Sequence, residues 1–315
     1  MPEFGIQIEP QFGYDFKEVM EIARIGRGHG FSTLWFSDHF MLDADATQNV
    51  LLDPWLLMTA LVMLDKKIRV GSLVFCNSYR QPALHAKMAA TLDVLSEGRL
   101  EFGFGAGWKK IEYNAYGYQF PPYLTRIEQM EEAVEIIKGI WREEKFSFEG
   151  KHYRIKDAVS FPKPVQKPRP TIWIGTNRGG DHMIESIAKH GDGINFAWGF
   201  SAQQLEMAFG KMEGFASKSG REPSEIKRSV GLWTGVFADE DEMEKKLAER
   251  AEKRDISLEE YRARVASSFW GTPDMLVEKL RDFLALDISH FIFMFPYEEE
   301  KKQARMLGEK VLKRI

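Results

Sequence analysis

Short apolar runs alternate along the chain with segments whose apolar residues recur at three- and four-residue spacing. Eight runs have the length of buried strands, and the segments between them have the periodicity of amphipathic helices. The predicted strands are residues 4–8, 33–37, 68–75, 100–105, 171–175, 193–197, 230–237 and 289–295. The predicted helices are residues 16–29, 54–64, 82–95, 126–141, 182–190, 202–219 and 273–286.

This regular alternation favours a closed parallel barrel. Strands that are buried on both faces read as continuous apolar runs, and eight strand and helix pairs match a (β/α)8 TIM barrel. An open doubly wound sheet is disfavoured because Glu9-Pro10-Gln11-Phe12 follows the first strand, where a glycine fingerprint would stand. The glycines of 103–107 come later and have the wrong spacing for a dinucleotide loop. We predict one α/β barrel domain over residues 1–315.

Two segments exceed the minimal barrel and are predicted to be loop insertions. Residues 146–170 contain a hairpin-like turn at 148–153 and four prolines, at positions 162, 164, 168 and 170. Residues 239–270 form a charged helical stretch, which we expect to cover one side of the barrel mouth.

Composition narrows the class of ligand and the cellular location. The chain of 315 residues is 44% apolar, carries a formal charge of -4 and has no basic stripe, which argues against a nucleic-acid partner. A single cysteine, Cys76, excludes disulfides and cysteine-based zinc sites. The sequence lacks a signal-peptide pattern and a continuous apolar membrane span. We expect a cytoplasmic protein that binds small molecules.

Several common site chemistries are disfavoured by the motifs. The seven histidines show no His-x-His or His-Glu-x-x-His spacing, so we expect no catalytic metal. There is no Gly-x-Ser-x-Gly elbow of a serine hydrolase. Ser37, Asp38 and His39 are the residue types of a catalytic triad, but neighbours on an extended strand face opposite sides and cannot form its relay. A mouth that is rich in aromatic residues and glycine suits a flat organic cofactor that brings its own reactivity.

The second predicted strand ends at the pair Asp38 and His39. Polar residues at the carboxyl ends of barrel strands point into the shared mouth, so both are candidates for the site. An alternative reading is that Asp38 caps a following turn and His39 bonds to it. Spacing alone does not decide between the two.

Several motifs, read together, resemble the luciferase-like monooxygenase superfamily over nearly the whole chain. They are Ser37-Asp38-His39, residues 71–74 and 77–82, residues 86–99, residues 103–108 with Glu112 and 115–117, residues 191–193 and residues 271–273. Flavin monooxygenases of this superfamily tend to end the second strand in Glu-His-His. The branch that uses the deazaflavin coenzyme F420 tends to show Ser-Asp-His, as this chain does.

The resemblance implies an F420-dependent oxidoreductase that transfers a hydride between the coenzyme and an unidentified organic substrate, in a homodimer. An FMN-dependent monooxygenase is the first alternative. A non-catalytic flavin or deazaflavin carrier is the second.

The resemblance also implies roles for individual residues. Asp38 and His39 match the catalytic pair that lies against the cofactor ring, with His39 near the edge that accepts the hydride. Leu73 and Val74 fall where relatives have a bulge with a non-prolyl cis peptide behind the ring. The remaining cofactor-binding residues are predicted to be Gly105, Ala106, Gly107 and Trp108 around the ring, and Gly175, Thr176, Arg178, Gly179 and Gly180 in a phosphate-binding turn.

Some positions depart from relatives or are assigned outside the site. Relatives that oxidise glucose-6-phosphate carry glutamate where this chain has Trp108 and tryptophan where it has Asp43, which puts that substrate in doubt. Trp108 is predicted to wall the ring, with a place in the core as the alternative. Arg99 and Glu112 are expected to form an ion pair or a cap that holds the loop of the fourth strand. Cys76 is expected either near the ring or as an apolar filler.

Overall fold

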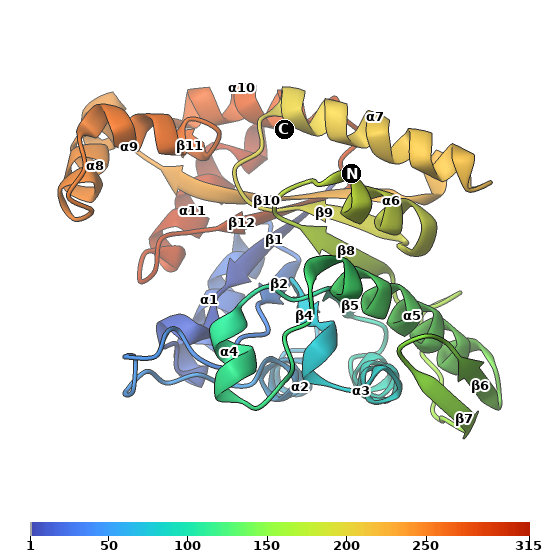
Figure 1. Cartoon of the computed structure of the whole chain (residues 1–315). Helices are drawn as coiled ribbons and strands as arrows, with labels where there is room; N and C mark the ends of the chain where they lie inside the picture. The colour runs from blue at the N-terminus through green and yellow to red at the C-terminus, as the bar shows by residue number, and fades with distance from the viewer. Residues whose placement is uncertain (1) are drawn as a thin grey trace.

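The computed structural model describes residues 2–315, and over this range eight parallel strands close into a barrel with helices around it (Figure 1). The strands of the model are β1 (Glu3–Ile8), β2 (Thr33–Phe36), β3 (Arg69–Ser72), β4 (Phe75–Cys76), β5 (Leu100–Gly105), β6 (Phe146–Glu149), β7 (Arg154–Ala158), β8 (Ile172–Thr176), β9 (Gly193–Phe196), β10 (Lys227–Val236), β11 (Phe269–Gly271) and β12 (His290–Met294). The barrel order is β1-β2-β3-β5-β8-β9-β10-β12, and β12 pairs with β1 to close it. The predicted (β/α)8 TIM barrel is confirmed.

The helices occupy the predicted segments and a few others. They are α1 (Phe16–Gly28), α2 (Pro54–Leu64), α3 (Pro82–Leu95), α4 (Lys110–Ala115), α5 (Tyr123–Arg142), α6 (Asp181–His190), α7 (Ala202–Lys218), α8 (Glu240–Glu252), α9 (Leu258–Val265), α10 (Pro273–Leu284) and α11 (Glu300–Lys310), with short 3-10 turns η1 (Pro10–Phe12), η2 (Asn77–Tyr79), η3 (Pro223–Glu225) and η4 (Leu312–Arg314). The unpredicted α11 is rich in charged residues and buries few apolar side chains, among them Ala304 and Leu307. Its apolar residues are therefore too few in the sequence to stand out.

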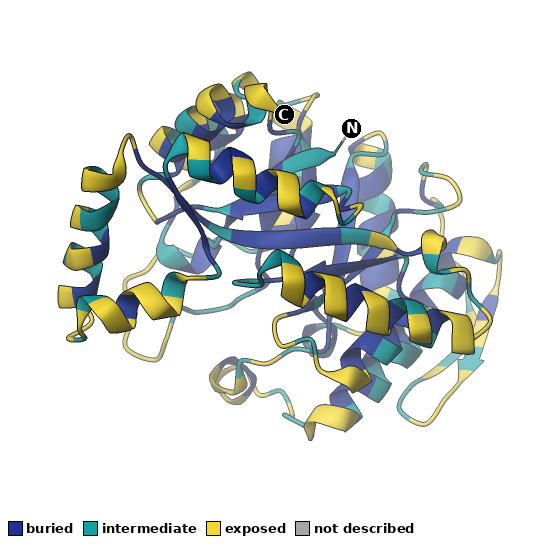
Figure 2. Cartoon of the chain, turned by 90° about the horizontal axis from the view of Figure 1, so that it is seen from above, coloured by how far each residue is buried: buried dark blue, intermediate teal, exposed yellow. Residues whose placement is uncertain are grey.

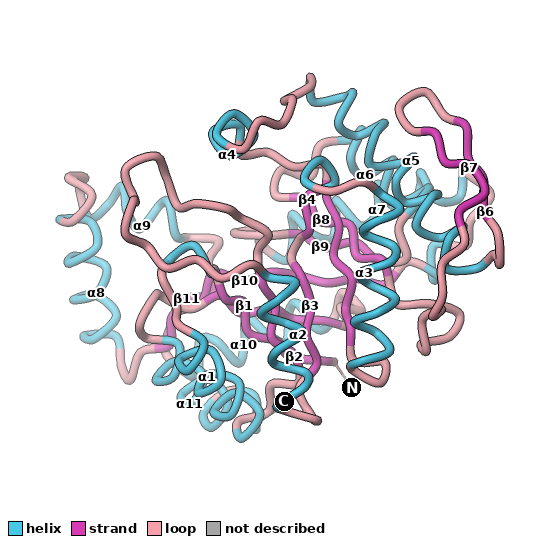
Figure 3. The backbone as a smooth tube through the Cα atoms, turned by 90° about the horizontal axis from the view of Figure 1, so that it is seen from below, coloured by secondary structure: helices cyan, strands magenta, loops and turns pink. Residues whose placement is uncertain are grey.

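The two predicted insertions lie on opposite sides of the molecule. Residues 146–170 contain the antiparallel hairpin β6-β7, and residues 239–270 contain α8, α9 and β11. Figures 1 and 3 both show α8 and α9 standing out on the side away from the hairpin. Because α8 begins just after β10 ends, it stands at the carboxyl end of that strand.

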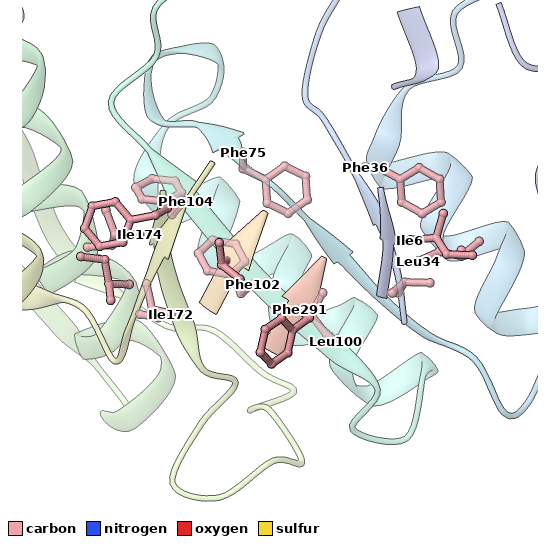
Figure 4. Packing of buried hydrophobic residues seen from close by; sticks show 14 of the residues in the cluster. Ile6, Leu34, Phe36, Phe75, Leu100, Phe102, Phe104, Ile172, Ile174 and Phe291 are labelled. Carbon is pink, nitrogen blue, oxygen red and sulfur yellow. The ribbon is translucent and has the colours of Figure 1, made fainter. Parts of the chain in front are cut away.

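The main core fills the layer between the strands and the helices. Each strand sends alternate side chains outward into this layer, as Leu100, Phe102 and Phe104 of β5 do in Figure 4. The helices bury only the faces that meet these side chains, and their outer faces are exposed (Figure 2). This packing fixes the strand ends where the site is built.

Two indoles fill the lower interior of the barrel. Trp35 of β2 lies in register with Gly71 of β3, and Trp173 of β8 lies in register with Gly193 of β9. A Cβ atom at Gly71 would lie 2.7 Å from the Trp35 ring, and one at Gly193 would lie 2.4 Å from the Trp173 ring. Each glycine thus gives an indole room to lie across its neighbouring strand.

Within residues 2–315, no helix combines the length and the apolar character needed to span a bilayer.

Candidate active site

A cavity of about 590 Å³ opens at the carboxyl ends of the barrel strands. This volume is within the usual range for sites that bind small molecules and cofactors. Most of the residues predicted from the sequence line it together: Asp38, His39, Leu73, Val74, Gly105, Ala106, Gly107, Trp108, Gly175, Thr176, Arg178 and Gly180. Gly179 lies in the same turn as Gly180 without lining the cavity itself.

The cavity also has walls that the sequence did not indicate. The unpredicted residues include Glu9 after β1, Tyr79 of η2, and Asn195 and Trp198 at the end of β9. Glu9 accepts hydrogen bonds from Gln7 at 2.7 Å and from Gln11. Its position directly after a predicted strand was the available signal, the same one that identified Asp38.

His39 is held by Glu112 and not by its neighbour Asp38. Its Nδ1 lies 2.9 Å from Oε2 of Glu112, a residue of α4 whose side chain is fully buried. The same carboxylate accepts hydrogen bonds from the Tyr79 hydroxyl at 2.7 Å and from the backbone N–H groups of Phe40 and Met41. The alternative in which His39 bonds to Asp38 is wrong.

These hydrogen bonds keep Glu112 ionised. Burial alone would raise its pKa, but the contacts with His39, Tyr79 and the backbone lower the pKa from 4.5 to about 2. An ionised carboxylate only accepts hydrogen bonds, so Nδ1 of His39 must carry the proton toward it. Nε2 of His39 bonds to no other side chain or backbone group in the described part of the chain, and whenever the imidazole is neutral this nitrogen is the one that can accept a proton.

The expectation that Arg99 and Glu112 form an ion pair is therefore wrong. Glu112 does not line the cavity, but it contacts His39, which does. Arg99 instead donates to the backbone carbonyls of Val62, Asp65 and Ile68, at 2.7 to 3.0 Å. It thus caps the carboxyl end of α2, which agrees with the expected capping role for Arg99 alone.

Asp38 lines the cavity, but its carboxylate is buried in a salt bridge. Its carboxylate accepts two hydrogen bonds from Nη1 of Arg80, at 2.8 and 3.1 Å, and one from the backbone N–H of Cys76 at 3.0 Å. Arg80 also donates to Asp53, which caps the start of α2. Asp38 therefore ties the loop that carries His39 to β4 and α2.

A bulge at Leu73 and Val74 interrupts the third barrel strand and projects into the cavity. The peptide bond between these two residues is cis, as the resemblance predicted. Cβ atoms at Gly105 and Gly175 would lie 2.6 and 2.8 Å from the Val74 methyl groups. The glycines of β5 and β8 thus leave room for Val74, and both also line the cavity.

The segment that follows β5 supplies the adjoining part of the wall. Gly107 has a φ of +78°, and a Cβ there would lie 1.9 Å from the Tyr113 hydroxyl and 2.7 Å from Sγ of Cys76. Cys76 is buried and its sulfur lies 3.2 Å from the Tyr113 oxygen, beside the cavity. The Trp108 side chain is 64% exposed and meets His39 edge to face at 5.7 Å. Trp108 therefore belongs to the cavity rim, and its alternative place in the core is wrong.

The turn between β8 and α6 has the geometry of an anion site. The Thr176 hydroxyl accepts hydrogen bonds from the N–H groups of Arg178 and Gly179, and Gly179 has a φ of +59°. Gly180 is the N-cap of α6 and offers no side chain to the N–H groups of the first turn. Those groups and the Arg178 side chain are available to an anion.

A metal site in a protein requires a group of candidate ligand side chains. Among residues 2–315, no three His, Cys, Asp or Glu side chains are grouped so that they could hold a metal ion.

Comparisons with known proteins agree on one family. A family model described as luciferase-like monooxygenase matches residues 3–290. An F420-dependent glucose-6-phosphate dehydrogenase from Microbacterium testaceum (strain StLB037) is 26% identical, over 97% of this chain and 94% of that protein. An FMNH2-dependent dimethylsulfone monooxygenase from Pseudomonas putida is 27% identical, over 79% of this chain and 66% of that protein.

Solved structures share the fold at low sequence identity. The F420-dependent tetrahydromethanopterin reductase from Methanopyrus kandleri superposes with a TM-score of 0.79 at 20% identity, and each chain is 99% covered. An F420-dependent secondary alcohol dehydrogenase in complex with an F420-acetone adduct gives a TM-score of 0.82 at 19% identity, with 98% of each chain covered.

Proposed function

This chain belongs to the luciferase-like monooxygenase family and is an oxidoreductase, and we propose that its cofactor is coenzyme F420. In this proposal the enzyme transfers a hydride between F420 and a small organic substrate. The observation that carries it is His39 at the cavity, with Nδ1 fixed by Glu112 and Nε2 free. The Ser37-Asp38-His39 ending of the second strand and the F420-dependent relatives support the choice of cofactor.

The residues of the cavity fit such a cofactor. Leu73 and Val74 offer an apolar surface for one face of a flat ring, and His39 and Trp108 lie at its rim. The β8–α6 turn offers N–H groups and Arg178 to an anionic tail. Bound there, the deazaflavin would supply two-electron hydride chemistry.

The protein's own part in the reaction is to hold and move a proton. Nε2 of His39 accepts a proton from a substrate hydroxyl when the substrate is oxidised, and returns it in the reverse direction. Glu112 keeps the proton on Nδ1 and stabilises the imidazolium that forms. Asp38 was predicted to be catalytic as well. Its contacts with Arg80 and Cys76 favour a positioning role, in which it anchors the loop of His39.

We propose a substrate other than glucose-6-phosphate, although several relatives act on that sugar. The family resemblance implies that such relatives carry glutamate at the position of Trp108, which stands at the cavity rim, and tryptophan at the position of Asp43. An indole at this position favours contact with an apolar substrate surface.

A fluorescence titration with F420 and FMN side by side tests the cofactor. We expect F420 to bind more tightly than FMN to the purified wild-type protein. Tighter binding of FMN would favour the second candidate, an FMN-dependent monooxygenase, which the dimethylsulfone monooxygenase relative supports. If neither compound bound, the assignment of the cavity as a flavin or deazaflavin site would be wrong.

We also propose a homodimer that forms through α2. Leu56, Met63 and Leu64 recur on one side of this helix, and Leu56 and Leu64 are 73% and 65% exposed. Leu84, on the adjacent α3, is also exposed. Adjoining exposed apolar side chains of this kind mark interaction surfaces in monomeric structures.

A further inference from the structure

A second cavity, of about 490 Å³, lies between α8 and the loops at the barrel mouth. We call it the α8 pocket. Phe12, Trp233 and Tyr297 form its aromatic wall, from η1, β10 and the loop after β12. Arg250, Lys253 and Arg254 form its cationic wall, at the end of α8.

The side chains that line the α8 pocket carry a net positive charge. Lys246 also lines it and is paired with Glu249 at 3.3 Å and with Glu299 at 3.9 Å, the two carboxylates of the pocket. In the described part of the chain, Arg250, Lys253 and Arg254 form no ion pair within 4.0 Å. The cationic wall therefore has positive charge available for a ligand.

Two cations of this wall are already held in place by aromatic rings behind them. The Arg250 guanidinium lies 5.1 Å from the Trp270 ring centre, and that of Arg254 lies 5.4 Å from the ring centre of Tyr261. A side chain that is already ordered loses less conformational entropy when it binds a ligand.

Cations in the last turn of a helix also stabilise that helix, so their charge alone would not indicate a ligand. The aromatic side chains that line the same pocket are the second observation. The Phe12 and Tyr297 rings lie 5.9 Å apart, and Tyr297 is 40% exposed although Tyr14 packs against its ring. A partly open aromatic surface in the same pocket as unpaired guanidinium groups matches a ligand with a flat apolar body and an anionic group.

The α8 pocket adjoins the main cavity. After β1, Glu9 lines the main cavity and Phe12, three residues later, lines the α8 pocket. After β2, His39 lines the main cavity and Leu42, again three residues later, lines the α8 pocket. Three residues of chain span at most about 10 Å, so the two cavities share the loops after β1 and β2.

We propose that the α8 pocket is a binding site for an aromatic organic anion, such as an aryl carboxylate. The body of the ligand packs on Phe12, Trp233 and Tyr297, and its anionic group accepts hydrogen bonds from Arg250 and its cationic neighbours. The residues that line the α8 pocket differ from those that line the main cavity. This binding therefore does not depend on which cofactor the main cavity holds.

Calorimetric titration with 2-naphthoate and 2-naphthamide tests the site, because the two probes share one ring system and differ in charge. We expect the wild-type protein without added cofactor to bind 2-naphthoate about tenfold more tightly, as charge-assisted hydrogen bonds allow. Arg250→Gln and Lys253→Gln, made separately, should weaken the binding of 2-naphthoate and leave that of 2-naphthamide unchanged. Tyr297→Leu should weaken the binding of both probes.

Lys245→Gln is the matched control, since Lys245 is an exposed residue of α8 that does not line the pocket. Equal affinity for the two probes, or no binding of either, would overturn the proposal. An effect of Lys245→Gln as large as that of Arg250→Gln would also overturn it, because it would show only a general attraction to the charge of α8. An F420 titration of the same variants keeps this outcome separate from the cofactor assignment, since these residues do not line the main cavity.

Discussion

Glu112 acts on the reaction through His39, and this coupling is testable. In Glu112→Gln the fixed negative charge beside Nδ1 is lost, so the imidazole is no longer held in one tautomer. We expect kcat to fall about 10- to 100-fold, as for other residues that orient a functional histidine, while KM and the affinity for F420 change little. Steady-state kinetics and a cofactor titration measure this split.

Glu112→Asp provides the comparison, because it keeps the charge and should retain more activity than Glu112→Gln. Melting temperatures of both variants show whether the fold is intact. Equal activity of Glu112→Gln and the wild type would remove Glu112 from the mechanism.

His85 makes the stability of the fold depend on pH. It is fully buried near the rings of Trp55, Phe75 and Phe104, and burial, assisted by Arg80, lowers its pKa from 6.5 to about 3. Between these values the unfolded chain binds a proton that the native state does not, so stability falls as the pH drops. We expect a loss on the order of 3 kcal/mol between pH 6.5 and pH 4.

Urea unfolding at several pH values measures this loss. His85→Phe cannot take up the proton and should lose correspondingly less stability over the same interval. His182→Gln, at an exposed histidine of α6, should behave like the wild type. A wild-type stability that did not change between pH 6.5 and pH 4 would contradict the prediction.

The contact between β5 and the bulge after β3 depends on a missing side chain. In Gly105→Ala the new methyl group would lie 2.6 Å from Val74 and force this stiff side chain toward the cavity. We expect a cost of about 1–3 kcal/mol in unfolding free energy and weaker cofactor binding. Gly210→Ala in α7 meets no atom within 4 Å and should be neutral or slightly stabilising. If both variants behaved alike, Gly105 would not be needed for the bulge.

The strands and most helices could be predicted from the sequence because their signals are local. A parallel strand that is buried on both faces must be apolar throughout, and its carboxyl end marks the site, which is how Asp38 and His39 were identified. The helix α11 escaped prediction because its side chains are mostly charged.

The pairings within the site could not be predicted in the same way. His39 and Glu112 are 73 residues apart, and their contact depends on how α4 packs over the mouth. The functions of Gly105 and Gly107 also depend on neighbours from other elements, Val74 and Tyr113, which no local pattern reveals.

Association of two copies through α2 is the prediction for the assembled protein. Light scattering coupled to size-exclusion chromatography should give the mass of a dimer for the wild type and of a monomer for Leu64→Glu. Met207→Glu replaces an equally accessible side chain on α7 and should leave the dimer intact. A monomeric wild type would rule out the assembly.

The indoles of Trp35 and Trp173 and their paired glycines belong to the strands of the barrel, and the rim of the cavity belongs to the loops. Trp35 and Trp173 are buried inside the barrel, on strands, and pack in one cluster with Leu73 and Val74, which line the cavity, whereas Trp108 and Arg178 at the rim lie on loops. With this arrangement, evolution can change the substrate or the reaction by altering a few loops while the strands are kept. Relatives with different named reactions can thus keep one scaffold after most of their residues have diverged.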